Sequence, residues 1–216
     1  MEILNKFLAP NITLEQFLKV FYEKEPYASP DQALEFCKIL SWSTLQEIFR
    51  IQSEDSWPVR QGHISKEFAN SKGKLIPDLA RCAFANGHSI VVRHAEKGNM
   101  QLKMIAEEFQ NFFQRSVDLQ VYLTPAGQEG FGWHYDVEEV FIIQTQGRKE
   151  FRLLKNTVTP RPLSLFTAEN SQFSFEQKAP EIRYLLQAGD WLYIPAGYWH
   201  KAKALSDSFH ISVGVM

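Results

Sequence analysis

Cysteine is nearly absent from this chain of 216 residues, which holds only Cys37 and Cys82. Two isolated cysteines without a CxxC spacing exclude a disulfide framework and indicate thiols in a reducing compartment. No apolar run approaches the ~20 residues that span a bilayer, and Met1 to Asn5 lacks the basic start and long apolar stretch of a signal peptide. We therefore expect a cytoplasmic protein with no membrane partner.

The chain also lacks an excess of positive charge. Its formal net charge is −2 and its pI is about 6.3, so there is no basic field for a nucleic-acid backbone and a nucleic-acid partner is disfavoured. In contrast, hydrophobic residues make up 44% of the chain and include seventeen Phe. A chain of this length and composition can bury one sizeable core, so we expect a single domain over residues 1–216.

The hydrophobic pattern changes from helical to strand-like along the chain. Thr13 and Gln16 form a capping box, followed by an apolar face at Leu14, Phe17, Leu18 and Phe21, and a second helix is expected from Pro30. Further helices are expected over residues 76–85 and 102–113, around a strand at 89–93. A period of two then predicts strands at residues 119–124, 140–144, 150–154, 173–176, 183–186, 191–194 and 208–215.

This order predicts a mainly β protein with N-terminal helices. Residues 1–56 form the expected helical part, and residues 57–216 form the β core with its flanking helices. Many short strands after a helical beginning are typical of a barrel or jelly roll that carries helices on one side. We expect the apolar residues of the helical part, among them Phe17, Leu45 and Phe49, to cover that side.

Two histidines and an aspartate form a candidate metal site. Alternate side chains of a strand share a face, so His134 and Asp136 can point at one metal. His200 lies sixty-four residues after Asp136 (200 − 136) and follows a turn, a short apolar strand and a Pro-Ala-Gly turn. Two histidines and one carboxylate form the facial triad that holds Fe(II) and leaves coordination positions open. A single histidine in a strand is more often an ordinary core or surface residue, but this combination favours the metal site.

The sequence from Tyr122 to Ser212 resembles the JmjC-type cupin oxygenases, most closely the group of ribosomal oxygenases that hydroxylate side chains of ribosomal proteins. The resemblance is carried by residues 134–144, by Gly147-Arg148-Lys149, and by the run from Gly189-Asp190 through Tyr193-Ile194-Pro195 to His200. It implies a double-stranded β-helix (a jelly roll) and a dioxygenase that uses Fe(II), molecular oxygen and 2-oxoglutarate as co-substrate. The substrate it implies is a protein or peptide, which is hydroxylated while 2-oxoglutarate is oxidised to succinate.

The resemblance also implies roles for individual residues. It makes Lys149 the cation that grips the distal carboxylate of 2-oxoglutarate, Tyr122 a pocket tyrosine, and His210 and Ser212 strand positions beside the co-substrate. The iron ligands that it implies are His134, Asp136 and His200. The residues alone leave alternatives open: Lys149 also fits a solvated hairpin turn, and His210 and Ser212 also fit a polar outer face of the last strand.

The sequence departs from this family in several places. Gln120 stands where relatives often carry Asn, Trp133 where a small residue or Pro is usual, and Phe151 where Trp is common. The chain ends at Met216, without the helical dimerisation and winged-helix regions of ribosomal oxygenases, so we expect a monomer or a weak dimer. Other functions stay open: a hydroxylase of a small molecule or RNA, an N-methyl-lysine demethylase, or a non-catalytic cupin that acts as a binding module.

Overall fold

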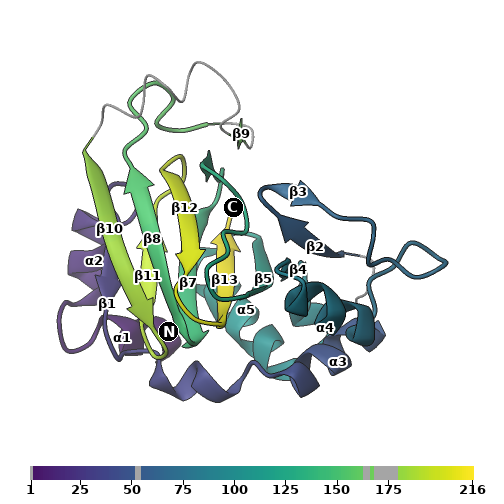
Figure 1. The fold of residues 1–216 in the computed structure, drawn as a ribbon. Helices are drawn as coiled ribbons and strands as arrows, with labels where there is room; N and C mark the ends of the chain where they lie inside the picture. Colours follow the sequence, from purple (N-terminus) through teal and green to yellow (C-terminus); the bar gives the residue numbers. More distant parts are fainter. Residues whose placement is uncertain (1, 52–54, 163–165, 168–179) are drawn as a thin grey trace.

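Two antiparallel sheets dominate the computed structural model, which describes residues 2–51, 55–162, 166–167 and 180–216 (Figure 1). The larger sheet has the strand order β1 (Tyr27–Ser29), β11 (Trp191–Ile194), β7 (Glu139–Gln146), β13 (Ser208–Val215), β5 (Val117–Thr124), β4 (Ser89–Val92), β2 (Ser56–Arg60) and β3 (His63–Ile64). The smaller sheet has the order β10 (Glu181–Gln187), β8 (Arg148–Leu154), β12 (Trp199–Ala204), β6 (His134–Tyr135) and β9 (Phe166–Thr167).

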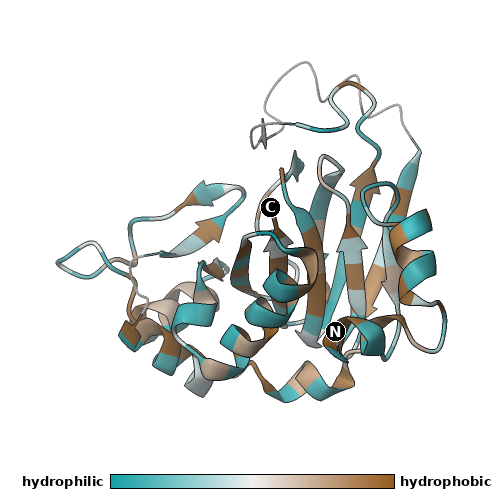
Figure 2. Ribbon diagram, turned by 180° about the vertical axis from the view of Figure 1, so that it is seen from behind, coloured by the Kyte–Doolittle hydropathy of each residue, from teal (hydrophilic) through white to brown (hydrophobic). Residues whose placement is uncertain are grey.

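Helices cover the outer face of the larger sheet. They are α1 (Glu2–Leu8), α2 (Leu14–Val20), the 3₁₀ helix η1 (Leu34–Lys38), α3 (Trp42–Ile51), α4 (Pro77–Ala85), the 3₁₀ helix η2 (Ala95–Lys97) and α5 (Met100–Phe113). Seen from the helical side, apolar strands lie behind helices that present polar residues outward (Figure 2). In the described part of the chain, no helix combines the length and the apolar character needed to cross a membrane.

The main core lies between these helices and the larger sheet. Phe141, Ile211 and Val213 point from the sheet into this core, and Phe17 meets the Phe141 ring at 6.2 Å between centroids. Phe17, Leu45 and Phe49 are buried there, so the predicted cover of the sheet is confirmed for these three residues. Leu18 is 37% exposed, because it lies on the outer side of α2.

A second apolar cluster lies between the two sheets. Strand alternation turns Val140 and Ile142 of β7 away from the helices, and they pack with Phe151 and Leu153 of the smaller sheet. The space between the sheets is therefore only partly filled by apolar side chains, and the candidate site occupies the rest of it.

Most predicted elements are confirmed. The capping box of Thr13 and Gln16 forms at α2, the strand at residues 191–194 has the predicted bounds, and the strand at 208–215 does too. The predicted strand at 173–176 lies outside the described residues. The overall class, mainly β with N-terminal helices, is also confirmed.

The N-terminal part, residues 1–56, is mostly helical as expected but also contains strand residues. Tyr27–Ser29 forms β1, which pairs with residues 191–193 of β11, and the expected second helix is only the 3₁₀ turn η1 followed by α3. A strand of three residues is too short to show a period of two, and its backbone partners are more than 160 residues away in the sequence (191 − 29). Ser56–Arg60 likewise forms a strand, β2, that was not predicted.

Candidate metal centre and its pocket

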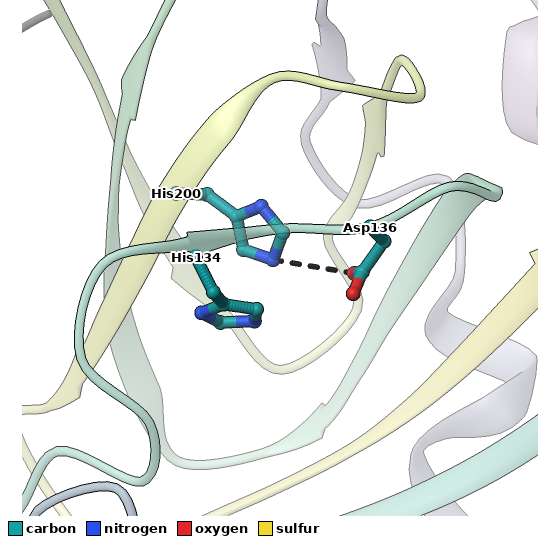
Figure 3. A group of neighbouring side chains, drawn as sticks. All are labelled: His134, Asp136 and His200. Carbon is teal, nitrogen blue, oxygen red and sulfur yellow. Dashed lines mark ion pairs between the residues drawn. The ribbon is translucent and has the colours of Figure 1, made fainter. Parts of the chain in front are cut away.

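Strands β6 and β12 bring His134 and His200 together. The two residues are antiparallel partners, and their ring centroids lie 4.2 Å apart. Asp136 follows β6, and its Oδ2 lies 3.5 Å from Nε2 of His200 (Figure 3). One ligand atom from each of the three residues fits within a cluster no wider than 4.8 Å. The structure thus assembles the three side chains that the sequence analysis singled out.

Hydrogen bonds orient both imidazole rings. A carbonyl oxygen can only accept, so Nδ1–H of His134 donates to the Gly132 carbonyl over 2.8 Å, and Nδ1–H of His200 donates to the Tyr198 carbonyl over 3.0 Å. These bonds place the proton on Nδ1 and leave the Nε2 lone pair free for a metal. Burial lowers the pKa of His200 to about 4; the neighbouring His134 acts in the same direction and Asp136 opposes it. His200 is therefore neutral at pH 7, the form that binds metals.

Lys149 is a buried cation on the same pocket. Lys149 is only 3% exposed. Its Nζ donates to Thr124 Oγ1 over 3.0 Å and lies 3.4 Å from Nδ1 of His210. Neither contact is a carboxylate, and burial lowers the Lys149 pKa to about 7. The alternative of a solvated hairpin turn was wrong, because β7 and β8 belong to different sheets and the chain crosses between them at Gly147.

His210 and Tyr122 form the wall beside Lys149. They are direct partners on β13 and β5, and their rings stack with centroids 4.8 Å apart and planes within 3°. The Tyr122 hydroxyl donates to Gln120 Oε1 over 2.7 Å. Burial and the nearby Lys149 hold the pKa of His210 well below its usual value. The alternative of a polar outer face was wrong, because Ile211 takes the helix side and turns His210 and Ser212 inward.

One pocket holds all of the residues that the sequence analysis proposed for the site. It encloses about 490 Å³ of empty space, part of which is open to solvent. Its lining includes the proposed residues Tyr122, His134, Asp136, Lys149, His200, His210 and Ser212, and also Gly130, Phe131, Val140, Ile142, Phe151 and Ala202. The pocket therefore joins a polar set of possible metal ligands to a largely apolar wall and a buried cation.

Thr124 and Phe131 are among the contributors that were not proposed from the sequence. Thr124 accepts the Lys149 hydrogen bond, and its alternation with Tyr122 on β5 was a signal that could have found it. Phe131 lines the pocket and meets the His134 ring at 5.7 Å. It precedes β6 in a loop, where no strand period fixes the direction of a side chain, so the sequence held no signal for its position.

The two ends of the pocket differ in chemistry. On β12, His200 and Ala204 are four residues apart, which is about 13 Å along a strand, and Ala204 is the register partner of Lys149. The metal-ligand set and the ammonium group are thus separated along the strands, with Val140 and Ile142 between the sheets. This arrangement can hold an elongated acid that binds a metal at one end and a cation at the other.

Comparison with known proteins identifies the family. The JmjC domain family matches residues 93–216. The bifunctional lysine-specific demethylase and histidyl-hydroxylase NO66 of Dictyostelium discoideum is 36% identical over 149 residues, which cover 67% of this chain and 28% of that protein. Ribosomal oxygenase 2 of Bos taurus is 30% identical over 230 residues, which cover 98% of this chain and 47% of that protein. The chain spans less than half the length of either relative.

Solved structures share the fold. An X-ray structure of ycfD from E. coli superposes with a TM-score of 0.71 and 22% identity over 95% of this chain and 53% of that one. A structure of YcfD described as a ribosomal oxygenase in complex with cobalt and 2-oxoglutarate superposes with a TM-score of 0.66 and 20% identity, over 95% of this chain and 52% of that one. The family match covers more than half of the chain and includes β6, β8, β12 and β13, which carry the pocket. This chain therefore belongs to the JmjC domain family.

Proposed function

We propose that this chain is an Fe(II)- and 2-oxoglutarate-dependent dioxygenase that hydroxylates a side chain of a protein or peptide. The observation that carries the proposal is that one pocket joins the His134, Asp136 and His200 cluster to the buried ammonium of Lys149. The relatives support the choice of a protein substrate, since their names describe a histidyl-hydroxylase and a ribosomal oxygenase.

The donor atoms fit a resident Fe(II). Nε2 of His134, Nε2 of His200 and a carboxylate oxygen of Asp136 would hold the ion, because the Nδ1 atoms of both rings are already committed to backbone carbonyls. Two imidazoles and one carboxylate on one face leave the opposite face open. When bound with 2-oxoglutarate, iron supplies the activation of molecular oxygen for hydroxylation of a C–H bond.

Lys149 would hold the distal carboxylate of 2-oxoglutarate. Its ammonium is already removed from water, and the polar partners that it has among the described residues, Thr124 and His210, are both neutral, so an entering carboxylate would supply an opposite charge. Thr124 can turn its hydroxyl to donate to the same carboxylate. The stacked Tyr122 and His210 rings, with Phe151 beside them, would exclude water from this end of the pocket.

We further propose that the two sheets form a double-stranded β-helix within one domain over residues 1–216. The chain crosses repeatedly between the sheets: β7 belongs to the larger sheet, β8, β9 and β10 to the smaller one, β11 to the larger, β12 to the smaller and β13 to the larger. Such repeated crossing is typical of a jelly roll. The helical part packs on the larger sheet through a continuous core, which supports a single domain.

An anaerobic titration of the Fe(II) protein with 2-oxoglutarate tests the proposal. We expect a weak visible charge-transfer band that is absent from the His134→Ala variant. Bound iron without this band in the wild type would instead favour a non-catalytic cupin that acts as a binding module. Mixing the active protein with a lysate should then give one protein that gains the mass of one oxygen atom.

The product distinguishes the remaining alternatives. Release of formaldehyde from a methylated lysine peptide would show a demethylase, since hydroxylation of an N-methyl carbon yields an unstable product. Oxygen incorporation into RNA or a metabolite, with no modified protein, would replace the proposed substrate class.

A further inference from the structure

Glu139 is a buried carboxylate that lies outside the pocket. It begins β7 three residues after Asp136, and strand alternation turns it toward the helices while Val140 lines the pocket. The residue is only 5% exposed. A carboxylate taken out of water this far is costly unless its oxygens accept hydrogen bonds, so its partners show what it holds in place.

The groups that face the Glu139 carboxylate lie near the end of β11 and in the turn after it. The Tyr193 hydroxyl, on a fully buried ring, donates to Oε2 of Glu139. Burial raises the pKa of Glu139, whereas the bond from Tyr193 and the nearby backbone N–H of Ala196 act in the opposite direction. The Tyr193 hydroxyl and the Ala196 N–H belong to residues on either side of Ile194 and Pro195. The Glu139 carboxylate therefore lies against both the end of β11 and the turn that follows it.

The same turn is bonded to Asp136 and leads to His200. Gly197, the residue after Ala196, donates its N–H to the backbone carbonyl of Asp136 over 2.8 Å. Tyr198 closes the turn with a bond of 3.2 Å to the Pro195 carbonyl, and its own carbonyl accepts the 3.0 Å bond from Nδ1–H of His200. The two segments that carry the proposed ligands are therefore joined through two adjoining amides, one bound by Asp136 itself and one by Glu139.

We propose that Glu139 is a positioning residue of the metal centre, which sets the separation of Asp136 and His200 by fixing the turn of residues 195–197 against the start of β7. The inference rests on the proposed function. Loss of the carboxylate leaves the buried Tyr193 O–H without its acceptor and removes the anion beside the Ala196 N–H. The turn then shifts to recover a partner, and the ring of His200 moves with the Tyr198 carbonyl that orients it.

Binding of Co(II) to the metal-free protein measures this directly, without turnover. The Co(II) affinity is obtained by competition with a chelator, and the visible Co(II) spectrum reports the ligand geometry. We expect Glu139→Ala to weaken Co(II) binding by about tenfold to a hundredfold, the range found when the outer support of a metal ligand is removed, with an altered spectrum. Glu139→Gln retains a neutral acceptor for the Ala196 N–H, so its Co(II) affinity should fall only several-fold.

Two variants separate positioning from general stability. Tyr193→Phe removes a donor to the same carboxylate but leaves the Ala196 bond, so its Co(II) affinity should exceed that of Glu139→Ala. Glu108→Ala removes another half-buried carboxylate that accepts a backbone bond, from Ile3 over 2.6 Å, and should leave Co(II) affinity and spectrum unchanged even where it lowers the melting temperature.

The outcomes are distinguishable. If the wild type binds no Co(II), or if His134→Ala binds Co(II) as tightly as the wild type, both the proposed function and this inference are refuted. Wild-type Co(II) affinity and spectrum in a folded Glu139→Ala protein remove the inference alone. If Glu139→Ala does not fold, Glu139→Gln decides: affinity and spectrum equal to wild type show that Glu139 serves only the stability of the fold.

Discussion

Replacement of Lys149 by Met is expected to stabilise the metal-free, ligand-free protein while it weakens binding of 2-oxoglutarate. The Lys149 pKa falls from 10.5 to about 7 because the ammonium is buried, which corresponds to roughly 5 kcal/mol of unfavourable free energy when the group is charged. Relaxation of the variant and loss of the bond to Thr124 offset part of this. Replacing a buried ion pair by apolar residues of similar volume has gained about 1–4 kcal/mol elsewhere. For this single buried amine we expect Lys149→Met to raise the free energy of unfolding by about 2 kcal/mol at pH 7.

The gain should depend on pH with a definite sign. Between pH 7 and pH 10.5 the unfolded state keeps the Lys149 proton and the folded state releases it, so the wild type becomes more stable as the pH rises, by about 1.4 kcal/mol per unit from this group. The advantage of Lys149→Met is therefore largest at or below pH 7 and shrinks above it. Urea unfolding followed by circular dichroism measures this, with Lys203→Met, an exposed position on β12, as the control.

Ligand binding should move in the opposite direction. Loss of a charge-assisted bond to a buried carboxylate costs roughly 1.5–3 kcal/mol, so Lys149→Met and Lys149→Ala should bind 2-oxoglutarate more than tenfold more weakly in a calorimetric titration of the Co(II) protein. Lys149→Arg should be the mildest change, because a cation remains. The reasoning is refuted if Lys149→Met gains no stability at any pH, or if its affinity for 2-oxoglutarate equals that of the wild type.

Three further outcomes are expected. His134→Ala, Asp136→Ala and His200→Ala should each abolish turnover and lower the iron content while the unliganded protein stays folded; full iron content with activity in all three would disprove the triad. Gly197→Ala should destabilise the protein by about 1–3 kcal/mol in a denaturant titration, because Gly197 has φ +82° and a Cβ there would lie 2.5 Å from the Pro160 carbonyl oxygen; a neutral effect would contradict the close approach. Light scattering should give a monomer, since the helical cover is buried against the larger sheet, and a stable dimer would refute this.

The local sequence pattern predicted much of the candidate metal site. The alternation rule placed His134 and Asp136 on one face, and the turn-and-strand spacing indicated that His200 returns to them, which the register of β6 and β12 bears out. That these three residues bind a metal is a prediction, which the iron content and turnover of their Ala variants test. Lys149 was different, because Gly147-Arg148-Lys149 has the local signature of a solvated hairpin, and only the resemblance to a family suggested a pocket residue.

The sequence by itself determined the class of elements, most strand positions, the capping box at Thr13 and the pairing of His134 with Asp136, because these depend on dihedral preferences and on neighbours within a few residues. Only the tertiary structure decided which face of β13 is inner, where β1 pairs, and that Lys149 is buried beside His210. Alternation in a strand defines two faces but does not say which one meets the helices. That choice, and with it the burial and the pKa of each polar group, depends on segments that are distant in the sequence and meet only when the two sheets come together.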